Sequence, residues 1–218
     1  MATKKFPLVT GEIYHIFSKS IADFEIFKNI SECERMKNLF KYYNLEAQLR
    51  FAMFKKLSNE KDSFQKHLAK KEKLIEIIAY CLMPTHLHLV LKQSKEKGIS
   101  IFMSNILNSY TRYFNIKIKR KGPLWEGRFR RVLVRTDEQL LHLTRYVHLN
   151  PVTAYLVNKP QDWQFSSYKE YLGEVEDGER ICNYSGILDV TPQGYKEFVN
   201  SHIDYQRELA RIKDLLLE

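Results

Sequence analysis

The chain has 218 residues, of which 44% are hydrophobic and 13% aromatic, and its net charge at pH 7 is +9. This composition excludes an intrinsically disordered chain, and no apolar run approaches the roughly 20 residues that span a bilayer. The N-terminus lacks the apolar segment of a secretory leader. We therefore expect a soluble, cytoplasmic protein with one principal domain.

The first half of the chain predicts a strand, a helix and a pair of strands. Residues 12–18 alternate between apolar and polar side chains, and residues 31–43 place apolar side chains on one helical face. Residues 45–73 indicate only a weak strand or helix followed by a charged connection. Residues 74–82 and 86–92 are strongly β-forming, and the proline break between them predicts two adjacent antiparallel strands.

The second half predicts an amphipathic helix over residues 100–119, a strand over 128–135 and a helix over 137–149. Asn150 and Pro151 are expected to end that last helix. Helices and strands therefore alternate without a long parallel series. This order favours an α+β sandwich in which helices pack on a small antiparallel sheet.

The remaining residues form a tail, with an acidic stretch at 173–179 and a predicted helical end at 194–218. Three isolated cysteines, Cys33, Cys81 and Cys182, form no CxxC pair. An odd number of isolated cysteines argues against a disulfide framework or a zinc ribbon, so we expect reduced, structural thiols.

The positive charge is concentrated between residues 117 and 135, a segment that contains eight basic residues and one acidic residue, Glu126. Trp125 and Phe129 lie among them, and this mixture is typical of contacts to phosphates and bases, especially of single strands. A solvated basic face is the alternative, and Trp125 could stack on a base or fill the core. The candidate DNA-binding residues are Lys117, Lys119, Arg120, Lys121, Trp125, Arg128, Arg130 and Arg131.

Two histidines, His86 and His88, are candidate metal ligands. They lie two residues apart on a predicted strand, so both imidazoles point to one face, while the intervening and following leucines point to the other. The alternative is an incidental, packed pair. The following residues lack the Asp-His continuation of binuclear zinc hydrolases, which argues against that class.

Tyr110 is the candidate nucleophile. It lies on the apolar stripe of the helix predicted over residues 100–119, where a tyrosine can also be a core residue whose hydroxyl finds a partner. In the functional interpretation, the stripe packs towards the sheet and brings the phenol near a metal that His86 and His88 hold. A phosphate ester could be attacked there.

Four motifs in this order resemble those of a known family, the single-tyrosine HUH transposases. Tyr80-Cys-Leu-Met-Pro-Thr-His-Leu-His-Leu-Val90 is similar to the family's MPNHxH strand. The other three, which resemble the REP-associated tyrosine transposase branch, are residues 109–115 (SYTRYFN), 122–129 (GPLWEGRF) and 146–152 (YVHLNPV). Order and spacing match from about residue 11 to 172.

The resemblance implies a ferredoxin-like α+β sandwich with a central antiparallel sheet, and a divalent cation, Mg²⁺ or Mn²⁺, at the histidines. It implies a catalytic domain over residues 1–172, with residues 173–218 as a C-terminal helical appendage. Tyr110 would attack single-stranded, hairpin-bearing DNA and leave a 5′-phosphotyrosine bond, which a 3′-hydroxyl can reverse. Both a monomer and a homodimer are compatible with the resemblance.

Two residues depart from the family pattern. Thr85 replaces the usual Asn before the first histidine. Relatives also carry a third, polar metal ligand one turn beyond the nucleophile, whereas Phe114 stands four residues after Tyr110, which leaves Asn115 as the candidate ligand. Tyr113 is the alternative nucleophile, and we expect His148 and Asn150 to cap and end a helix rather than take part in catalysis.

Two other functions remain open from the sequence. The same fold could bind nucleic acid without cleaving it, or the chain could be a sheet-based RNA-binding domain of the RRM type. The sequence lacks the ribonucleoprotein signature of RRM domains, and the RRM hypothesis leaves the histidine pair without a role.

Overall fold

The computed structural model describes residues 7–44 and 72–215. These residues form a four-stranded sheet in the order β2-β3-β1-β4, in which every neighbouring pair is antiparallel. The strands are β1 (Ile13–Lys19), β2 (Ile75–Met83), β3 (His86–Gln93) and β4 (Arg130–Val134). All but the last two residues of the segment 45–73 lie outside the described residues, so its prediction is not tested.

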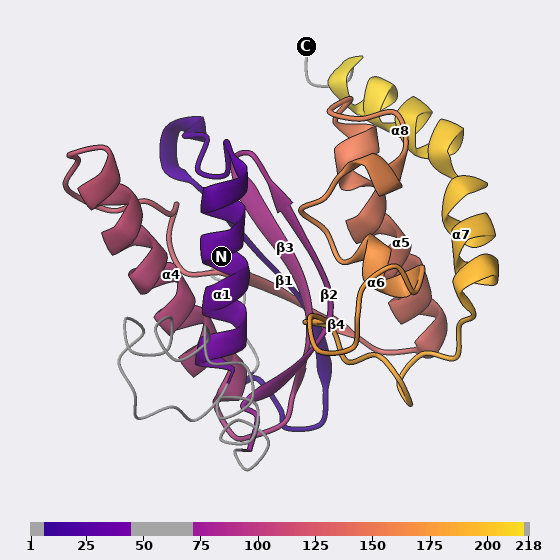
Figure 1. Cartoon of the computed structure of the whole chain (residues 1–218), viewed down its shortest axis with the longest axis horizontal. Helices are drawn as coiled ribbons and strands as arrows, with labels where there is room; N and C mark the ends of the chain where they lie inside the picture. Colours follow the sequence, from indigo (N-terminus) through magenta and orange to yellow (C-terminus); the bar gives the residue numbers. More distant parts are fainter. Residues whose placement is uncertain (1–6, 45–71, 216–218) are drawn as a thin grey trace.

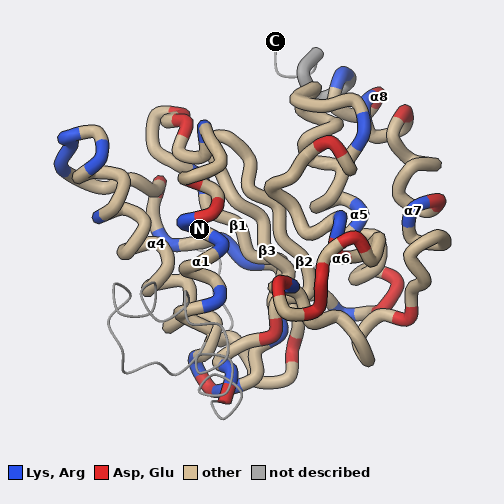
Figure 2. The backbone as a smooth tube through the Cα atoms, viewed as in Figure 1, with Lys and Arg blue, Asp and Glu red and all other residues tan. Residues whose placement is uncertain are grey.

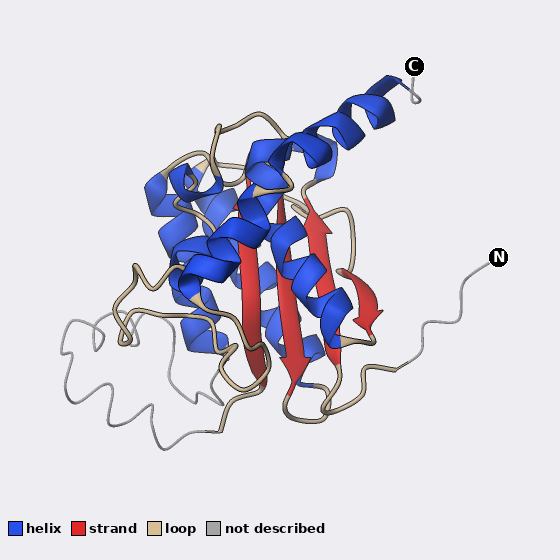
Figure 3. Cartoon of the chain, turned by 90° about the vertical axis from the view of Figure 1, so that its right-hand side faces the viewer, coloured by secondary structure: helices blue, strands red, loops and turns tan. Residues whose placement is uncertain are grey.

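Helices cover both faces of the sheet (Figures 1 and 3). On one face lie α1 (Ile30–Tyr43) and α4 (Gly98–Lys117). On the other lie α5 (Asp137–Thr153), α6 (Tyr168–Tyr171), α7 (Pro192–Asn200) and α8 (Ile203–Leu215), while η1 (Ile21–Asp23) and η2 (Pro160–Asp162) are single 3-10 turns. Within the described parts of the chain, no helix is long and apolar enough to cross a membrane.

The strand order places α1 and α4 on the same face. Because β1 and β2 are both antiparallel to β3, they are parallel to each other, and by the same reasoning β3 is parallel to β4. The chain therefore contains two split β-α-β units, each of which strongly favours a right-handed crossover. Two crossovers of the same hand deliver both helices to one face, which confirms the ferredoxin-like α+β sandwich.

Strand β3 divides its side chains between two cores. Leu87, Leu89 and Leu91 are fully buried with the apolar stripes of α1 and α4. Val90 is buried on the opposite face, among side chains of α5, α6 and α7. The three cysteines are buried as free thiols in these two cores, as expected.

The predicted end of the helix at Asn150 and Pro151 is wrong, because α5 continues to Thr153 with Pro151 inside it. A proline within a helix loses one backbone hydrogen bond and crowds the preceding turn. Burial of Pro151 and Val152 in the core that α5 shares with the sheet offsets this cost. The extra turn keeps the side chain of Asn150 on the helix.

A buried chain of hydrogen bonds joins α7, α5 and β2. His148 of α5 is fully buried, with Nδ1 2.7 Å from the Tyr195 hydroxyl of α7 and Nε2 2.8 Å from Oγ of Ser167. Ser167 Oγ in turn accepts from the backbone N–H of Tyr80 in β2 at 2.9 Å. Since both ring nitrogens have partners, His148 is satisfied while neutral and holds α5 against the sheet.

This buried histidine predicts a loss of stability in mild acid. Burial lowers the pKa of His148 to about 3, whereas an unfolded histidine titrates near 6.5. The unfolded state therefore binds more protons below pH 6.5, and the free energy of unfolding falls as the pH falls. Between pH 7 and pH 5, His148 alone is expected to remove about 2 kcal/mol from the free energy of unfolding.

Urea unfolding of the wild type and of His148→Gln at pH 7 and pH 5 measures this contribution. The variant is expected to be less stable at pH 7, because glutamine cannot satisfy both partners, yet it should lose about 2 kcal/mol less than the wild type between the two pH values. Equal losses in the two proteins would contradict the assignment.

Candidate active site

A cavity of about 470 Å³ opens on the face of the sheet that α5 covers. Its wall combines the ends of β1 and β3, the segment before β4, and one side of α5. The lining residues are Phe17, Ser18, Lys19, Asp23, Thr85, His86, His88, Glu126, Gly127, Arg128, Arg130, Tyr146 and Asn150.

His86 follows a two-residue turn, Pro84 and Thr85. Backbone hydrogen bonds from the segment 20–26, which follows β1, hold this turn in place. The backbone N–H of Ser20 donates to the Thr85 carbonyl at 2.8 Å, and that of Ile26 donates to the Pro84 carbonyl at 2.7 Å. Between these two anchors, Ala22 and Asp23 adopt left-handed backbone conformations, with φ of 48° and 51°. Such backbone strain persists only where neighbouring structure enforces it, and here it borders the cavity.

His86 and His88 both face the cavity, as their spacing predicts. Their ring centroids are 5.0 Å apart and their planes are nearly perpendicular. Burial lowers the pKa of His86 to about 4, with a smaller contribution from Lys19, and burial lowers the pKa of His88 well below its usual value. Both imidazoles are therefore neutral at pH 7 and carry a lone pair that a metal ion can bind.

Thr85 partly compensates for the departure from the family's Asn at this position. Its hydroxyl oxygen lies 3.0 Å from Nδ1 of His86. When Nδ1 carries the ring proton, it donates a hydrogen bond to the Thr85 hydroxyl oxygen, and the lone pair of Nε2 remains free. Thr85 thus provides a side-chain hydrogen bond to His86.

Two residues of α5, Tyr146 and Asn150, share this cavity. The Tyr146 ring is perpendicular to that of His88, with centroids 5.8 Å apart, and the residue is 41% exposed. Burial raises the pKa of Tyr146, and the neighbouring Asn150 side chain offsets only part of this shift. Asn150 lies one turn later, and because its amide nitrogen donates to the Tyr146 carbonyl at 3.0 Å, its amide oxygen is the atom available to a cation.

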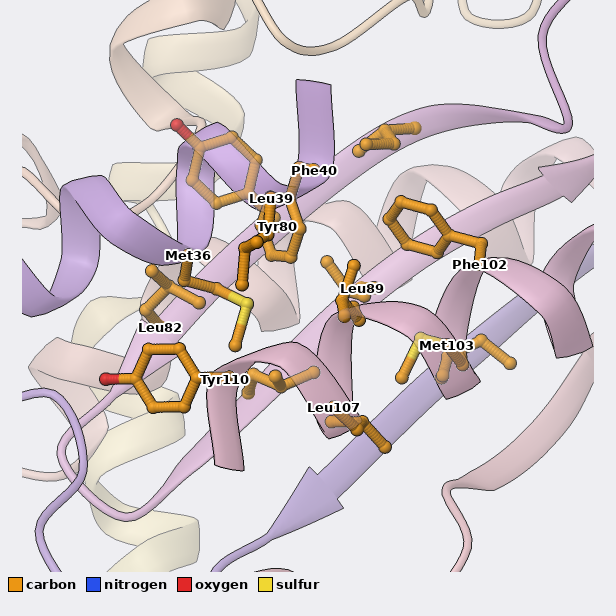
Figure 4. Close-up of a cluster of buried hydrophobic side chains, with 14 of the residues drawn as sticks. Met36, Leu39, Phe40, Tyr80, Leu82, Leu89, Phe102, Met103, Leu107 and Tyr110 are labelled. Carbon is orange, nitrogen blue, oxygen red and sulfur yellow. The ribbon is translucent and has the colours of Figure 1, made fainter. Parts of the chain in front are cut away.

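The expectation that the helix after the histidine strand brings Tyr110 near them is wrong. Tyr110 is fully buried on the opposite face of the sheet, in the core that also contains Met36, Leu82 and Leu107 (Figure 4). Its hydroxyl donates to the backbone carbonyl of Ile26, and burial raises its pKa far above the usual range. The apolar stripe of α4 does pack on the sheet, but on the face that carries Leu87, Leu89 and Leu91.

The two secondary candidates on α4 lie away from the histidines for the same reason. Tyr113 packs beside the core of α1 and α4, with the Arg35 guanidinium 5.2 Å from its ring centroid. Asn115 uses both ends of its amide at the end of α4. Its nitrogen donates to Gly122 at 2.8 Å and its oxygen accepts from Arg120 at 3.0 Å. The Asn115 side chain therefore holds the loop after α4 and lies away from the histidine cavity.

The candidate DNA-binding residues separate into two groups. Lys117, Lys119, Arg120 and Lys121 lie at the end of α4 (Figure 2), where Lys117 pairs with Glu32 at 2.7 Å. The second group lies on and before β4, where alternation places Arg130 opposite Phe17 on the histidine face. Only this second group contributes to the histidine cavity, through Arg128 and Arg130.

Trp125 and Arg131 face the α4 side instead. The Trp125 indole is buried and its N–H donates to the Leu107 carbonyl at 3.2 Å, so of the two roles expected for it the structure shows core packing. Arg131 pairs in register with Ile16 and lines a second cavity, of about 660 Å³, beside α4. Arg128 borders both cavities.

The donor set of the histidine cavity fits a divalent cation only when Asn150 is included. Among the described residues there is no cluster of three or more His, Cys, Asp or Glu side chains suited to a metal ion. Two neutral imidazoles from β3 and an amide oxygen from α5 suit Mn²⁺ better than Mg²⁺, which prefers oxygen ligands. The phenol of Tyr146 and the guanidinium of Arg130 lie in the same cavity.

Two signals in the sequence could have identified the α5 residues. Leu87, Leu89 and Leu91 alternate with the histidines, so a helix whose apolar stripe packs on the leucine side lies on the opposite face of the sheet from the histidines. The spacing of Tyr146 and Asn150 is that of helical neighbours, and the assumption that Asn150 ends the helix concealed it.

Residues 45–150 match the family model described as "Transposase IS200 like". This range includes both histidines, Tyr146 and Asn150. A curated protein of Haemophilus influenzae, described as "Putative REP-associated tyrosine transposase", is 27% identical over 103 residues, which cover 43% of this chain and 58% of the relative. The chain thus spans somewhat more than half the length of that relative.

The fold also matches a solved structure described as "Structure of the REP associates tyrosine transposase bound to a REP hairpin". The TM-score is 0.52 with 14% sequence identity, over 88% of this chain and 96% of that one. At this identity the match shows the fold alone. The family match and the curated relative confirm the resemblance that the four motifs indicate, to the REP-associated branch of the single-tyrosine HUH transposases.

Proposed function

We propose that this chain nicks single-stranded, hairpin-bearing DNA and joins strands again, with Tyr146 as the nucleophile. The observation that carries the proposal is the position of Tyr146 and Asn150. Both lie on α5 and line the same cavity as His86 and His88. Tyr146 is accessible to a substrate, whereas Tyr110 is sealed in the opposite core.

The chemistry follows from the groups in the cavity. The Tyr146 oxygen attacks the scissile phosphorus, the bond from phosphorus to the 3′ oxygen breaks, and the phenol proton is released. The leaving 3′ oxygen takes up a proton, so the products are a 5′-phosphotyrosine and a free 3′-hydroxyl. Attack by another 3′-hydroxyl reverses the step and restores Tyr146, so joining needs no external energy source.

His86, His88 and the amide oxygen of Asn150 would hold the divalent cation. When bound there, the cation would polarise the scissile phosphate and favour in-line attack. Arg130 and Arg128 add positive charge on the side of β4, where the phosphates that flank the scissile bond can bind. The REP hairpin in the related solved structure supports hairpin DNA as the substrate class.

Replacing Tyr146 with Phe is expected to abolish covalent attachment to DNA. Wild type, Tyr146→Phe and Tyr110→Phe are incubated with 5′- and 3′-labelled hairpin oligonucleotides from beside the gene, with Mn²⁺ or EDTA, and analysed on denaturing gels. A Mn²⁺-dependent adduct on the 3′ fragment is expected for the wild type and Tyr110→Phe, since Tyr110 contributes only to the core. Peptide mapping of the adduct should identify Tyr146.

Circular dichroism verifies that each variant is folded. An adduct that persists in folded Tyr146→Phe but disappears in folded Tyr110→Phe would overturn the assignment of the nucleophile. Hairpin binding by all three proteins, with no adduct on any flanking sequence, would favour a DNA-binding module that does not cleave.

Removing the amide oxygen of Asn150 is expected to weaken metal binding. Asn150→Ala should bind Mn²⁺ at least about tenfold more weakly than the wild type, whereas Asn150→Asp, which retains an oxygen ligand, should bind at least as tightly. Asn115→Ala is the matched control, and its Mn²⁺ affinity should equal that of the wild type. Titration of the DNA-free protein, followed by electron paramagnetic resonance, measures the affinity; a wild-type value for Asn150→Ala would exclude this ligand.

A further inference from the structure

His15 is a third histidine beside the candidate site, and it belongs neither to the four motifs nor to the proposed metal ligands. It lies on β1, two residues before Phe17, on the face that carries His86 and His88. Its Nε2 is 3.0 Å from Nδ1 of His88. Unlike His88, it is not among the residues that line the cavity, so it lies behind the ligand rather than beside the substrate.

The two rings face each other edge to edge. Their planes differ by 17° and their centroids are 5.2 Å apart. This separation is close to the N···N distance plus the two ring radii, so the nitrogens lie nearly on the line that joins the centroids. The contact is therefore an in-plane hydrogen bond and not a face-to-face stack.

This geometry allows only one proton arrangement when His88 binds a metal through the ring edge that faces the cavity. If His15 donated, the His88 proton would sit on Nε2 and block the lone pair there. If His88 donates from Nδ1, its Nε2 lone pair is free, and His15 accepts through its own unprotonated Nε2.

We infer that His15 is a positioning residue that accepts the Nδ1 proton of His88 and thereby keeps Nε2 of His88 directed at the cation. The inference rests on the proposed function, since it assumes that His88 is a metal ligand. Metal-binding histidines commonly donate their second nitrogen to such a partner, which fixes both tautomer and ring orientation. Thr85 serves His86 in the same way, so each ligand has one outer partner.

The same geometry excludes His15 as a direct ligand alongside His88 Nδ1. The two nitrogens point at each other along one line, so their lone pairs do not converge on a third point at metal-bonding distance. A cation between them would lie too close to both nitrogens.

Three substitutions in β1 separate the hydrogen bond from packing. His15→Phe keeps an aromatic ring but removes the acceptor, and His15→Gln restores an acceptor through its side-chain oxygen. Ile13→Ala is the matched packing control, because Ile13 lies on the same face of β1 as His15 and packs against the α5 core, but does not line the cavity. All are made in the full chain, and thermal unfolding of the metal-free proteins verifies that each is folded.

The readout is the Mn²⁺ affinity of the DNA-free protein, together with the count of coordinated nitrogens from pulsed electron paramagnetic resonance. His15→Phe should bind Mn²⁺ about 10- to 100-fold more weakly, and His15→Gln and Ile13→Ala should stay within about threefold of the wild type. The wild type should show two imidazole nitrogens on Mn²⁺, and His15→Phe at saturating Mn²⁺ should show the same two.

Unchanged affinity in folded His15→Phe, or a third imidazole that disappears with this substitution, overturns the inference. An equal loss of Mn²⁺ affinity in His15→Phe and His15→Gln also overturns it, because the affinity would then depend on the histidine ring itself and not on a hydrogen-bond acceptor at position 15. A wild type that binds no Mn²⁺ would instead refute the metal site of the proposed function. The two failures are therefore distinguishable.

Discussion

The attachment of α5 to the sheet through buried His148 is the interaction on which the candidate site depends. Its two ring nitrogens join the Tyr195 hydroxyl of α7 to Ser167, which in turn bonds the backbone of β2. On the same helix, Tyr146 precedes His148 by two residues and Asn150 follows it by two. Since α5 carries both groups into the cavity, a small shift of the helix would move the proposed nucleophile and the proposed amide ligand together.

This attachment also gives the C-terminal segment a structural role. Tyr195 is fully buried, and side chains of α7 share the core of α5 with β2 and β3. Helix α7 therefore completes the layer that holds α5. Helices α7 and α8 follow the tail predicted from the sequence, in two pieces instead of one.

Side chains alternate along β3 and β4, so those that line the histidine cavity lie on one face of the sheet and their neighbours in sequence lie on the other. The leucines of β3 form the core with α1 and α4, while its histidines face α5 and the cavity. On β4, Arg130 faces the same cavity and Arg131 faces the α4 side. A basic segment that is continuous in sequence therefore presents its charge to two different cavities, and Arg128 lies between them.

The sequence by itself determined the four strands and the main helices α1, α4 and α5, the shared face of the two histidines and the resemblance to a transposase family, because periodicity and motif spacing are local properties. It did not determine which helix covers the histidine face. That choice follows from the hand of the two β-α-β crossovers and from contacts across long sequence separations, such as His148 with Tyr195. Tyr110 and Tyr146 are both tyrosines on amphipathic helices after the histidine strand, and only the tertiary structure buries the first and exposes the second beside His88.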